Sequence, residues 1–167
     1  MPRAAATDVL SHWYHLVEGL QASPKEFYTA VEHAIEQHKL PDAKRHRIDW
    51  SEGGIFTAKR EYLRVTRKHL VFDICGAPFG TGFFVSWWLG NKSSSLRTLI
   101  LAIPVLGRIW EALFPDTYYK HDTALMFQAS VGNIVSEIVD EMATAKGLRT
   151  LSELERRPIL RELSNHS

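Results

Sequence analysis

Cysteine is almost absent from this sequence: Cys75 stands alone among 167 residues. One cysteine cannot form a disulfide within its own chain, so a disulfide-stapled secreted scaffold is excluded. The N-terminal stretch MPRAAATDVLSHWYHLVEGL also lacks the unbroken apolar core of a secretory signal. These two absences favour a reducing compartment, and we expect a cytoplasmic protein.

The sequence has no apolar run long enough to cross a membrane. Its most hydrophobic segment, residues 96–114, is interrupted by charged residues and by Pro104, and only Leu99–Leu106 is free of charge. A spanning helix needs about 20 predominantly apolar residues. We therefore expect this segment to lie in the core, in a protein interface or on a membrane surface.

Neither sign of charge dominates, since 20 Lys and Arg residues face 19 Asp and Glu residues. This balance, together with the lack of a recognisable motif, makes nucleic acid an unlikely partner. Basic residues nonetheless gather in residues 44–69, where eight of them stand against three acidic residues. The simplest interpretation is a solvated sheet face, and the functional one is contact with anionic lipid or an acidic partner.

The motifs that identify an enzyme are also missing. The histidine spacings, such as His12 with His15 and His33 with His38, match no metal-site pattern. Nothing places a histidine base beside Cys75, which we interpret as a buried, unreactive thiol. We therefore predict no catalytic residue, no metal ion and no cofactor.

What the sequence does contain is a glycine-rich, aromatic stretch, DICGAPFGTGFFVSWWLG, at residues 73–90. A phosphate-binding loop needs a helix directly behind its glycines, but a strand-like run follows Gly82 and no Gly-Lys-Ser/Thr ending is present. We predict instead a hairpin loop, in which Pro78 sets a bend and Gly80 and Gly82 adopt positive φ.

Hydrophobic spacing predicts an N-terminal pair of helices. Apolar residues recur every three or four positions over residues 7–21, which is typical of one helix face: Val9, Trp13, Leu16 and Leu20. A second helix begins with the capping pattern of Ser23, Pro24 and Glu26, and Pro41 ends it. The short joint between the two predicts an antiparallel pair.

A period of two then replaces the helical period. Runs rich in aromatic and β-branched residues fill residues 44–90, and Leu70, Phe72 and Ile74 alternate with their neighbours. Arg67-Lys68 lies between two such runs and is interpreted as a tight turn. We expect an antiparallel meander of three or four strands.

The strongest helical stripe covers residues 122–147, with Asp122 or Thr123 as its cap, and a short helix is expected in the tail that follows. The predicted fold is a single α+β domain with the long helix packed on the sheet. Its predicted parts are a helical pair at 1–41, the meander at 44–90, an apolar connecting segment at 96–114, the long helix at 122–147 and a tail at 150–167.

Aromatic side chains occupy both faces of the last predicted strand, so that strand is buried on both faces or meets a partner or lipid on one. Burial is the simpler interpretation. Combined with the basic residues, these aromatics define a candidate binding surface: Arg60, Arg64, Arg67, Lys68, Phe83, Phe84, Trp87 and Trp88.

The run from EYLRV through HLVFDICGAPFGTGFFVSWWL, continuing at TYYKHDTALMF, resembles an uncharacterised group of bacterial proteins over roughly residues 55–140. In similar proteins, the part after the tryptophans looks more like a hydrophobic hairpin that enters a membrane. In this sequence the corresponding segment, Leu96 to Phe114, is short and charged. The resemblance implies no catalytic assignment.

Two functions follow as hypotheses. The first is a non-enzymatic binding or assembly module, working at the cytoplasmic membrane face with a protein partner, through self-association or on an anionic membrane surface. The alternative is a pocket for a small apolar ligand or lipid between the sheet and the long helix, with hydrolytic activity left open.

Overall fold

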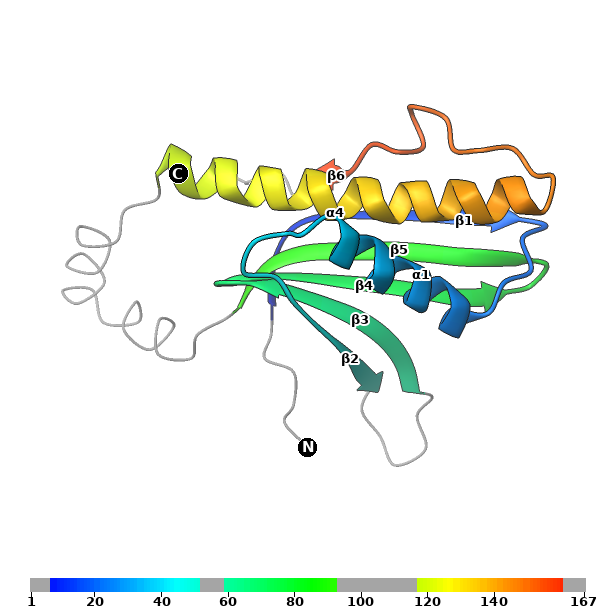
Figure 1. Ribbon diagram of the computed structural model, residues 1–167, viewed down its shortest axis with the longest axis horizontal. Helices are drawn as coiled ribbons and strands as arrows, with labels where there is room; N and C mark the ends of the chain where they lie inside the picture. The colour runs from blue at the N-terminus through cyan, green and yellow to red at the C-terminus, as the bar shows by residue number, and fades with distance from the viewer. Residues whose placement is uncertain (1–6, 52–58, 93–116, 161–167) are drawn as a thin grey trace, which may run out of the picture.

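The computed structural model describes residues 7–51, 59–92 and 117–160 as a six-stranded antiparallel sheet with two helices on one face (Figure 1). The strands follow the order β2-β3-β4-β5-β1-β6. The elements are β1 (Thr7–Glu18), α1 (Pro24–Gln37), β2 (Lys44–Ser51), β3 (Lys59–Arg67), β4 (Leu70–Phe79), β5 (Gly82–Lys92), α4 (Tyr118–Ala145) and β6 (Ile159–Leu160). The α+β class and the long C-terminal helix on an antiparallel sheet are therefore confirmed.

The predicted first helix is wrong, because residues 7–18 form β1. This strand pairs antiparallel with β5 along its length, from Thr7 opposite Lys92 to Glu18 opposite Gly82. Its burial alternates: Trp13 and Val17 are buried, whereas Tyr14 is exposed. Val9, Trp13 and Val17 recur every four residues, which fits one face of a strand as well as one face of a helix, so spacing alone favoured the wrong element. Leu16, part of the predicted helical stripe, is 38% exposed. Within residues 7–51, which the structure describes, there is one helix and not the predicted pair.

Strands β2 to β5 form an antiparallel meander, but β1 and β6 belong to the same sheet, so the predicted count of three or four strands is wrong and the sheet has six. The β3–β4 turn is Lys68-His69, one residue later than predicted, and Lys68 adopts a φ of 54°. The β4–β5 turn is Gly80-Thr81, where Gly80 has a φ of 59°. Pro78 does not bend this loop but lies within β4, opposite Phe83.

The core lies between the helices and the covered face of the sheet. From α1, Phe27 and Tyr28 are buried, and Phe27 meets Phe83 of β5 edge-on, with ring centroids 5.6 Å apart. From α4, Phe127 packs edge-on against Phe72 of β4 at 6.0 Å. Gly76 makes room for the first of these contacts, because a Cβ at that position would lie 2.3 Å from Cδ1 of Phe27.

Three other boundaries differ from the sequence-based expectation. The long helix begins at Tyr118 with Thr117 as its cap residue, rather than at Asp122 or Thr123. The expected short helix near the C-terminus is a turn at residues 153–156. The apolar segment 96–114 lies outside the described residues. None of the described helices is long and apolar enough to span a membrane.

Candidate functional site

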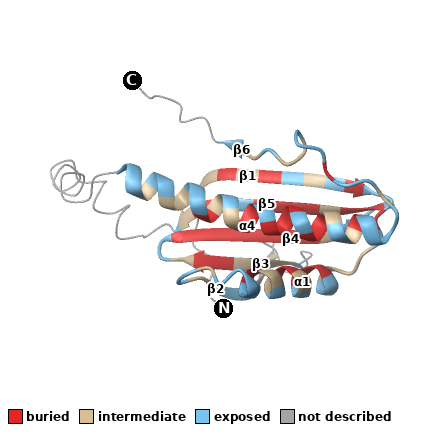
Figure 2. Cartoon of the chain, turned by 45° about the horizontal axis from the view of Figure 1, so that its top comes forward, coloured by how far each residue is buried: buried red, intermediate tan, exposed pale blue. Residues whose placement is uncertain are grey.

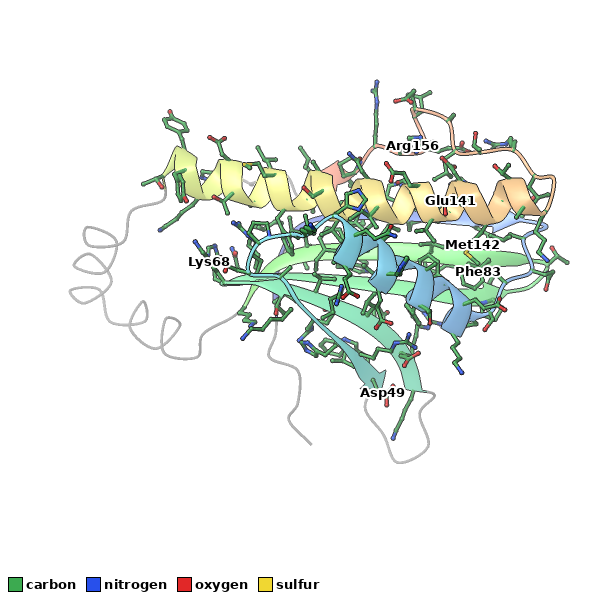
Figure 3. All side chains as sticks on the ribbon, in the orientation of Figure 1. Asp49, Lys68, Phe83, Glu141, Met142 and Arg156 are labelled. Carbon is green, nitrogen blue, oxygen red and sulfur yellow. The ribbon has the colours of Figure 1, made fainter. Side chains whose placement is uncertain are left out.

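The candidate binding surface divides between the two faces of the sheet. Phe83 and Trp87 point toward the helices and are 0% and 3% exposed. Trp87 lies against Phe72, with ring centroids 4.8 Å apart, and beside Gly132 of α4. These two aromatics hold the core together, so they cannot contact a partner directly. Figure 3 shows Phe83 beneath the helices and Lys68 at the opposite end of the sheet.

Phe84 and Trp88 lie on the opposite, outer face of the sheet, which neither described helix covers. Trp88 is 41% exposed and stacks on His12 of β1, with ring centroids 4.6 Å apart. Phe84 lies beside Tyr14, itself 58% exposed. Because residues 7–18 were interpreted as a helix, the contribution of Tyr14 to this aromatic strip was missed.

The four predicted cations also separate. Arg64 is held on the outer face by a bidentate ion pair with Asp73, with both N–O distances 2.7 Å, and its guanidinium lies 5.8 Å from the ring centroid of Trp50. Arg67 points to the helix side and donates to the carbonyl oxygen of Pro41 at 3.1 Å. Arg60 is exposed on β3, and Lys68 is exposed at the β3–β4 turn. Only Lys68 joins other cations.

Lys68 belongs to a basic hollow of about 440 Å³ at one end of the sheet. We define the basic hollow by its lining: Asp42, Ala43, Lys44, Thr66, Lys68 and Lys92. The three lysines are exposed, and no carboxylate in the described part of the chain forms an ion pair with any of them. Asp42 leaves a net charge of +2 on the lining.

Strand register brings these distant residues together on the outer face. Lys44 of β2 lies directly opposite Thr66 of β3, which in turn lies opposite Val71 of β4. Val71 lies opposite Gly90, and Lys92 follows Gly90 by two positions on the same strand face. The backbone N–H of Lys92 donates to the carbonyl oxygen of His69 at 2.8 Å, which ties the end of β5 to the β3–β4 turn.

The backbone around the basic hollow is strained. Among the described residues, three non-glycine residues have positive φ: Lys39 at 48°, Asp42 at 59° and Lys68 at 54°. Two of them line the hollow, and the third precedes it in the loop between α1 and β2. Left-handed conformations at such residues cost free energy and cluster at binding sites.

The helix side of this same end carries an apolar groove of about 200 Å³. Its lining comes from the α1–β2 loop, β3 and α4: Leu40, Pro41, Arg67, Tyr119, Thr123, Met126, Phe127 and Ser130. The first turns of α4 are largely exposed (Figure 2). Four large apolar residues there are exposed, at 90% for Tyr118, 74% for Tyr119, 54% for Leu125 and 69% for Met126.

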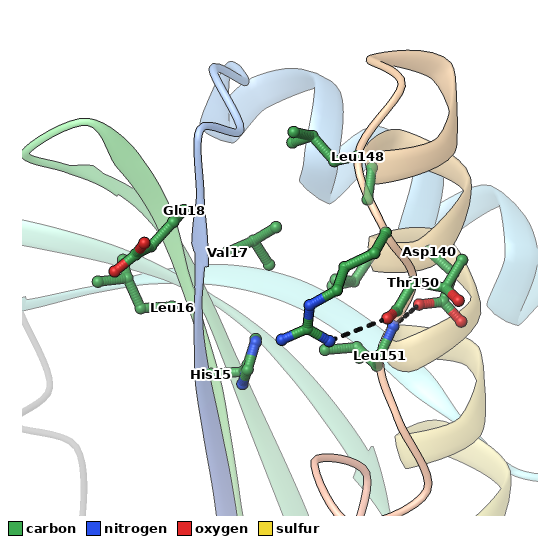
Figure 4. Close-up of a pocket in the computed structure, with 11 residues that line it drawn as sticks. His15, Leu16, Val17, Glu18, Asp140, Leu148, Thr150 and Leu151 are labelled. Carbon is green, nitrogen blue, oxygen red and sulfur yellow. Dashed lines mark hydrogen bonds between the residues drawn. The ribbon is translucent and has the colours of Figure 1, made fainter.

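A third hollow of about 300 Å³ lies between β1 and the C-terminal half of α4 (Figure 4). Polar side chains on its wall already have partners: Asp140 accepts from the N–H of Leu151 at 2.8 Å, and Arg149 forms an ion pair with Glu155 at 2.7 Å. The Arg149 guanidinium and the N–H of Ser152 lower the pKa of the Glu155 carboxyl.

This β1–α4 pocket lacks the arrangement of a hydrolase. His15 Nε2 lies 3.7 Å from the Glu155 carboxylate, but no hydroxyl or thiol among the described residues hydrogen-bonds to His15. Cys75 is 0% exposed, and burial raises the pKa of its thiol. The described residues also contain no group of three His, Cys, Asp or Glu side chains that could hold a metal ion.

In comparisons with known proteins, no family model, no curated protein and no solved structure matches the chain. The resemblance over residues 55–140 therefore stays a prediction.

Sequence reasoning missed most of the docking end, by which we mean the basic hollow, the apolar groove and the exposed first turns of α4. Lys44 and Lys68 were counted among the basic residues, but Lys92 was not. Their proximity depends on strand register, which the sequence does not display. One signal was present in the sequence of α4. Tyr118, Leu125 and Met126 are large apolar residues that fall outside the buried stripe of this helix.

Proposed function

We propose that this protein is a non-enzymatic binding module that attaches to an anionic membrane surface through its docking end. One observation carries the proposal: three lysines that form no ion pair with a described carboxylate and a group of exposed Tyr, Leu and Met side chains occur at the same end of the molecule. The apolar groove and the basic hollow share the α1–β2 loop, since Pro41 lines the first and Asp42 lines the second.

The two kinds of side chain supply different parts of the binding free energy. A cation near an anionic membrane contributes about 1 kcal/mol, so three lysines give roughly 3 kcal/mol. A dissociation constant of about 1 mM already requires roughly 4 kcal/mol of binding free energy, so the lysines alone do not reach it. Apolar contact has to add the rest, and tyrosine rings suit the interface because one end is apolar and the other polar.

Chain connectivity supports the same end. Residues 93–116 follow Lys92 of the basic hollow and precede Thr117, the cap residue of α4. Their sequence contains the uncharged run Leu99–Leu106, so the most hydrophobic stretch of the chain is attached on both sides to the docking end.

Co-sedimentation with vesicles tests this function. We expect binding to rise with the fraction of anionic lipid and to fall with added salt, because screening weakens exposed charges. Replacing Leu125 and Met126 by Ser should weaken binding without unfolding the domain, since both side chains are exposed. A monodisperse protein that ignores anionic vesicles even at low salt contradicts the proposal, and a native mass above one chain would then favour self-association.

The alternative, a small-ligand protein, is favoured by one observation: the β1–α4 pocket lies between the sheet and the long helix, as that hypothesis requires. Its volume of about 300 Å³ is at the lower end of ligand pockets, which run from about 300 to 1,000 Å³. Native mass spectrometry of the purified protein tests it. A bound small molecule lost in the variant Thr150→Trp, which adds bulk at an exposed position of the pocket wall, would support this function.

A further inference from the structure

We propose that the basic hollow is a subsite for a phosphate monoester, presented by the headgroup of a membrane lipid. This inference rests on the proposed function, because it concerns which anionic headgroup the docking end prefers. The three lysines come from β2, from the β3–β4 turn and from the end of β5, so they line the hollow from three separate elements and do not form a linear basic stretch.

Charge is the first argument for this ligand class. The lining carries three positive groups and one carboxylate, Asp42, for a net charge of +2. A phosphate monoester has a second pKa near 6, so it carries close to two negative charges at neutral pH. A phosphodiester or a serine headgroup offers less negative charge at one point. The Asp42 carboxylate repels any anion, so only an anion that engages several lysines offsets that repulsion.

Geometry is the second argument. Lysine ammonium groups act as compact point charges with three donors each, which suits a tetrahedral anion approached from several sides. Thr66 also lines the hollow, and a threonine hydroxyl is a hydrogen-bond donor that suits a phosphate oxygen. The volume of about 440 Å³ accommodates a phosphate with part of a glycerol or other polyol. No ion pair within the described chain has to break before the ligand enters.

Backbone conformation is the third argument. Asp42 and Lys68 both hold left-handed conformations, with φ of 59° and 54°. At Lys68 the two-residue β3–β4 turn requires this positive φ. The turn and the α1–β2 loop bring both residues to one shared space, where they line the hollow.

The test compares two vesicle preparations of equal surface charge, one containing phosphatidic acid and one containing phosphatidylserine. We expect about tenfold tighter binding to phosphatidic acid, equivalent to about 1.4 kcal/mol. The double variant Lys68→Gln and Lys92→Gln should lose this preference while keeping weaker binding to both vesicles. The matched control, Lys25→Gln with Lys146→Gln, removes two exposed lysines elsewhere and should retain the preference.

A pH series adds a second readout. The preference should decline as the pH is lowered through about 6, because the monoester takes up a proton there while a carboxyl headgroup stays ionised to about pH 4. Glycerol phosphate, added at millimolar concentration, reports whether a soluble monoester competes. Competition by glycerol phosphate together with a preference for phosphatidic acid supports the inference. If glycerol phosphate binds but the protein shows no preference between the vesicles, the ligand is not a lipid headgroup and the inference is wrong.

The outcomes separate the two proposals. If the wild type binds neither vesicle, the proposed function fails and this inference fails with it. If the wild type binds both vesicles equally at matched charge, the membrane function stands and the monoester subsite is wrong. A preference that persists in the Lys68 and Lys92 double variant also overturns the subsite.

Discussion

Arg64 has a different role in the structure from the one that its sequence context predicted. The local excess of positive charge favoured a free cation on a binding surface. In the structure, its side chain and that of Asp73 are only 12% and 11% exposed, and the two form a bidentate ion pair. Arg64 therefore stabilises the outer face of the sheet and is a poor choice for probing membrane contact.

We expect Arg64→Ala to lower the free energy of unfolding by about 3 kcal/mol, because it leaves the Asp73 carboxylate buried without a partner. Replacing both residues by apolar ones, as in Arg64→Met with Asp73→Leu, should recover most of that loss. Urea unfolding measures both effects, and Lys59→Ala, at an exposed position on the same strand, is the control. Equal losses in the single and double variants would contradict the ion-pair account.

Tyr28 gives the molecule a sensitivity to alkaline pH. Its hydroxyl donates to the carbonyl oxygen of Glu61 at 2.6 Å and accepts from the N–H of Gly76 at 3.0 Å. Burial raises the pKa of Tyr28 above its ordinary value of 10.0. A raised pKa favours the protonated hydroxyl in the folded state, so its stabilisation is complete below that ordinary value and is lost as the pH rises above it.

Above pH 10, we expect the free energy of unfolding to fall by about 1.4 kcal/mol per pH unit from Tyr28 alone. Tyr28→Phe should be less stable at pH 8, because the N–H of Gly76 loses its acceptor, but should show a shallower alkaline slope. Cys75 and Tyr62, whose pKa values burial also raises, add to the same slope. Urea denaturation at each pH measures the free energy of unfolding. If its alkaline slope is identical in the wild type and in Tyr28→Phe, Tyr28 does not have this role.

At the scale of elements, the sequence predicted β2 to β5, α1 and α4 because each has one dominant period or a clear capping signal. It failed for β1 because Val9, Trp13 and Val17 recur every four residues, a spacing that fits one face of a helix and also one face of a strand. Only the long pairing with β5 decides between them. The candidate site was less predictable still, since Lys44, Lys68 and Lys92 meet through register across four strands.

Two glycines within elements make a matched test of the packing between the helices and the sheet. A Cβ at Gly132 of α4 would lie 3.6 Å from the nearest atom of Trp87, an ordinary contact. Gly132→Ala should therefore stabilise the domain by about 0.5–1 kcal/mol through helix propensity. Gly76→Ala should instead destabilise it by about 1–3 kcal/mol, because its Cβ would overlap the Phe27 ring. Thermal unfolding of both variants checks the pair, and a destabilising Gly132→Ala would show that α4 packs closer to the sheet than described.

At the scale of the whole molecule, the helices cover one face of the sheet, and the proposed membrane contact lies at one end of the sheet. The exposed α4 turns and the basic hollow lie on different sides of the sheet but meet at the α1–β2 loop and the β3–β4 turn. A membrane that contacts this end can reach both. The opposite end, with Lys25 at the start of α1 and Lys146 after α4, would then face away from the lipid.

The most direct measurement of this orientation uses a polarity-sensitive fluorophore attached to one introduced cysteine. Leu125→Cys places it on the docking end and Lys25→Cys places it at the other end, while Cys75 stays buried and unlabelled. On addition of anionic vesicles, we expect the emission of the label at residue 125 to shift to the blue and brighten, and that of the label at residue 25 to stay unchanged. An unchanged spectrum at residue 125, or a blue shift confined to residue 25, would contradict attachment through the docking end.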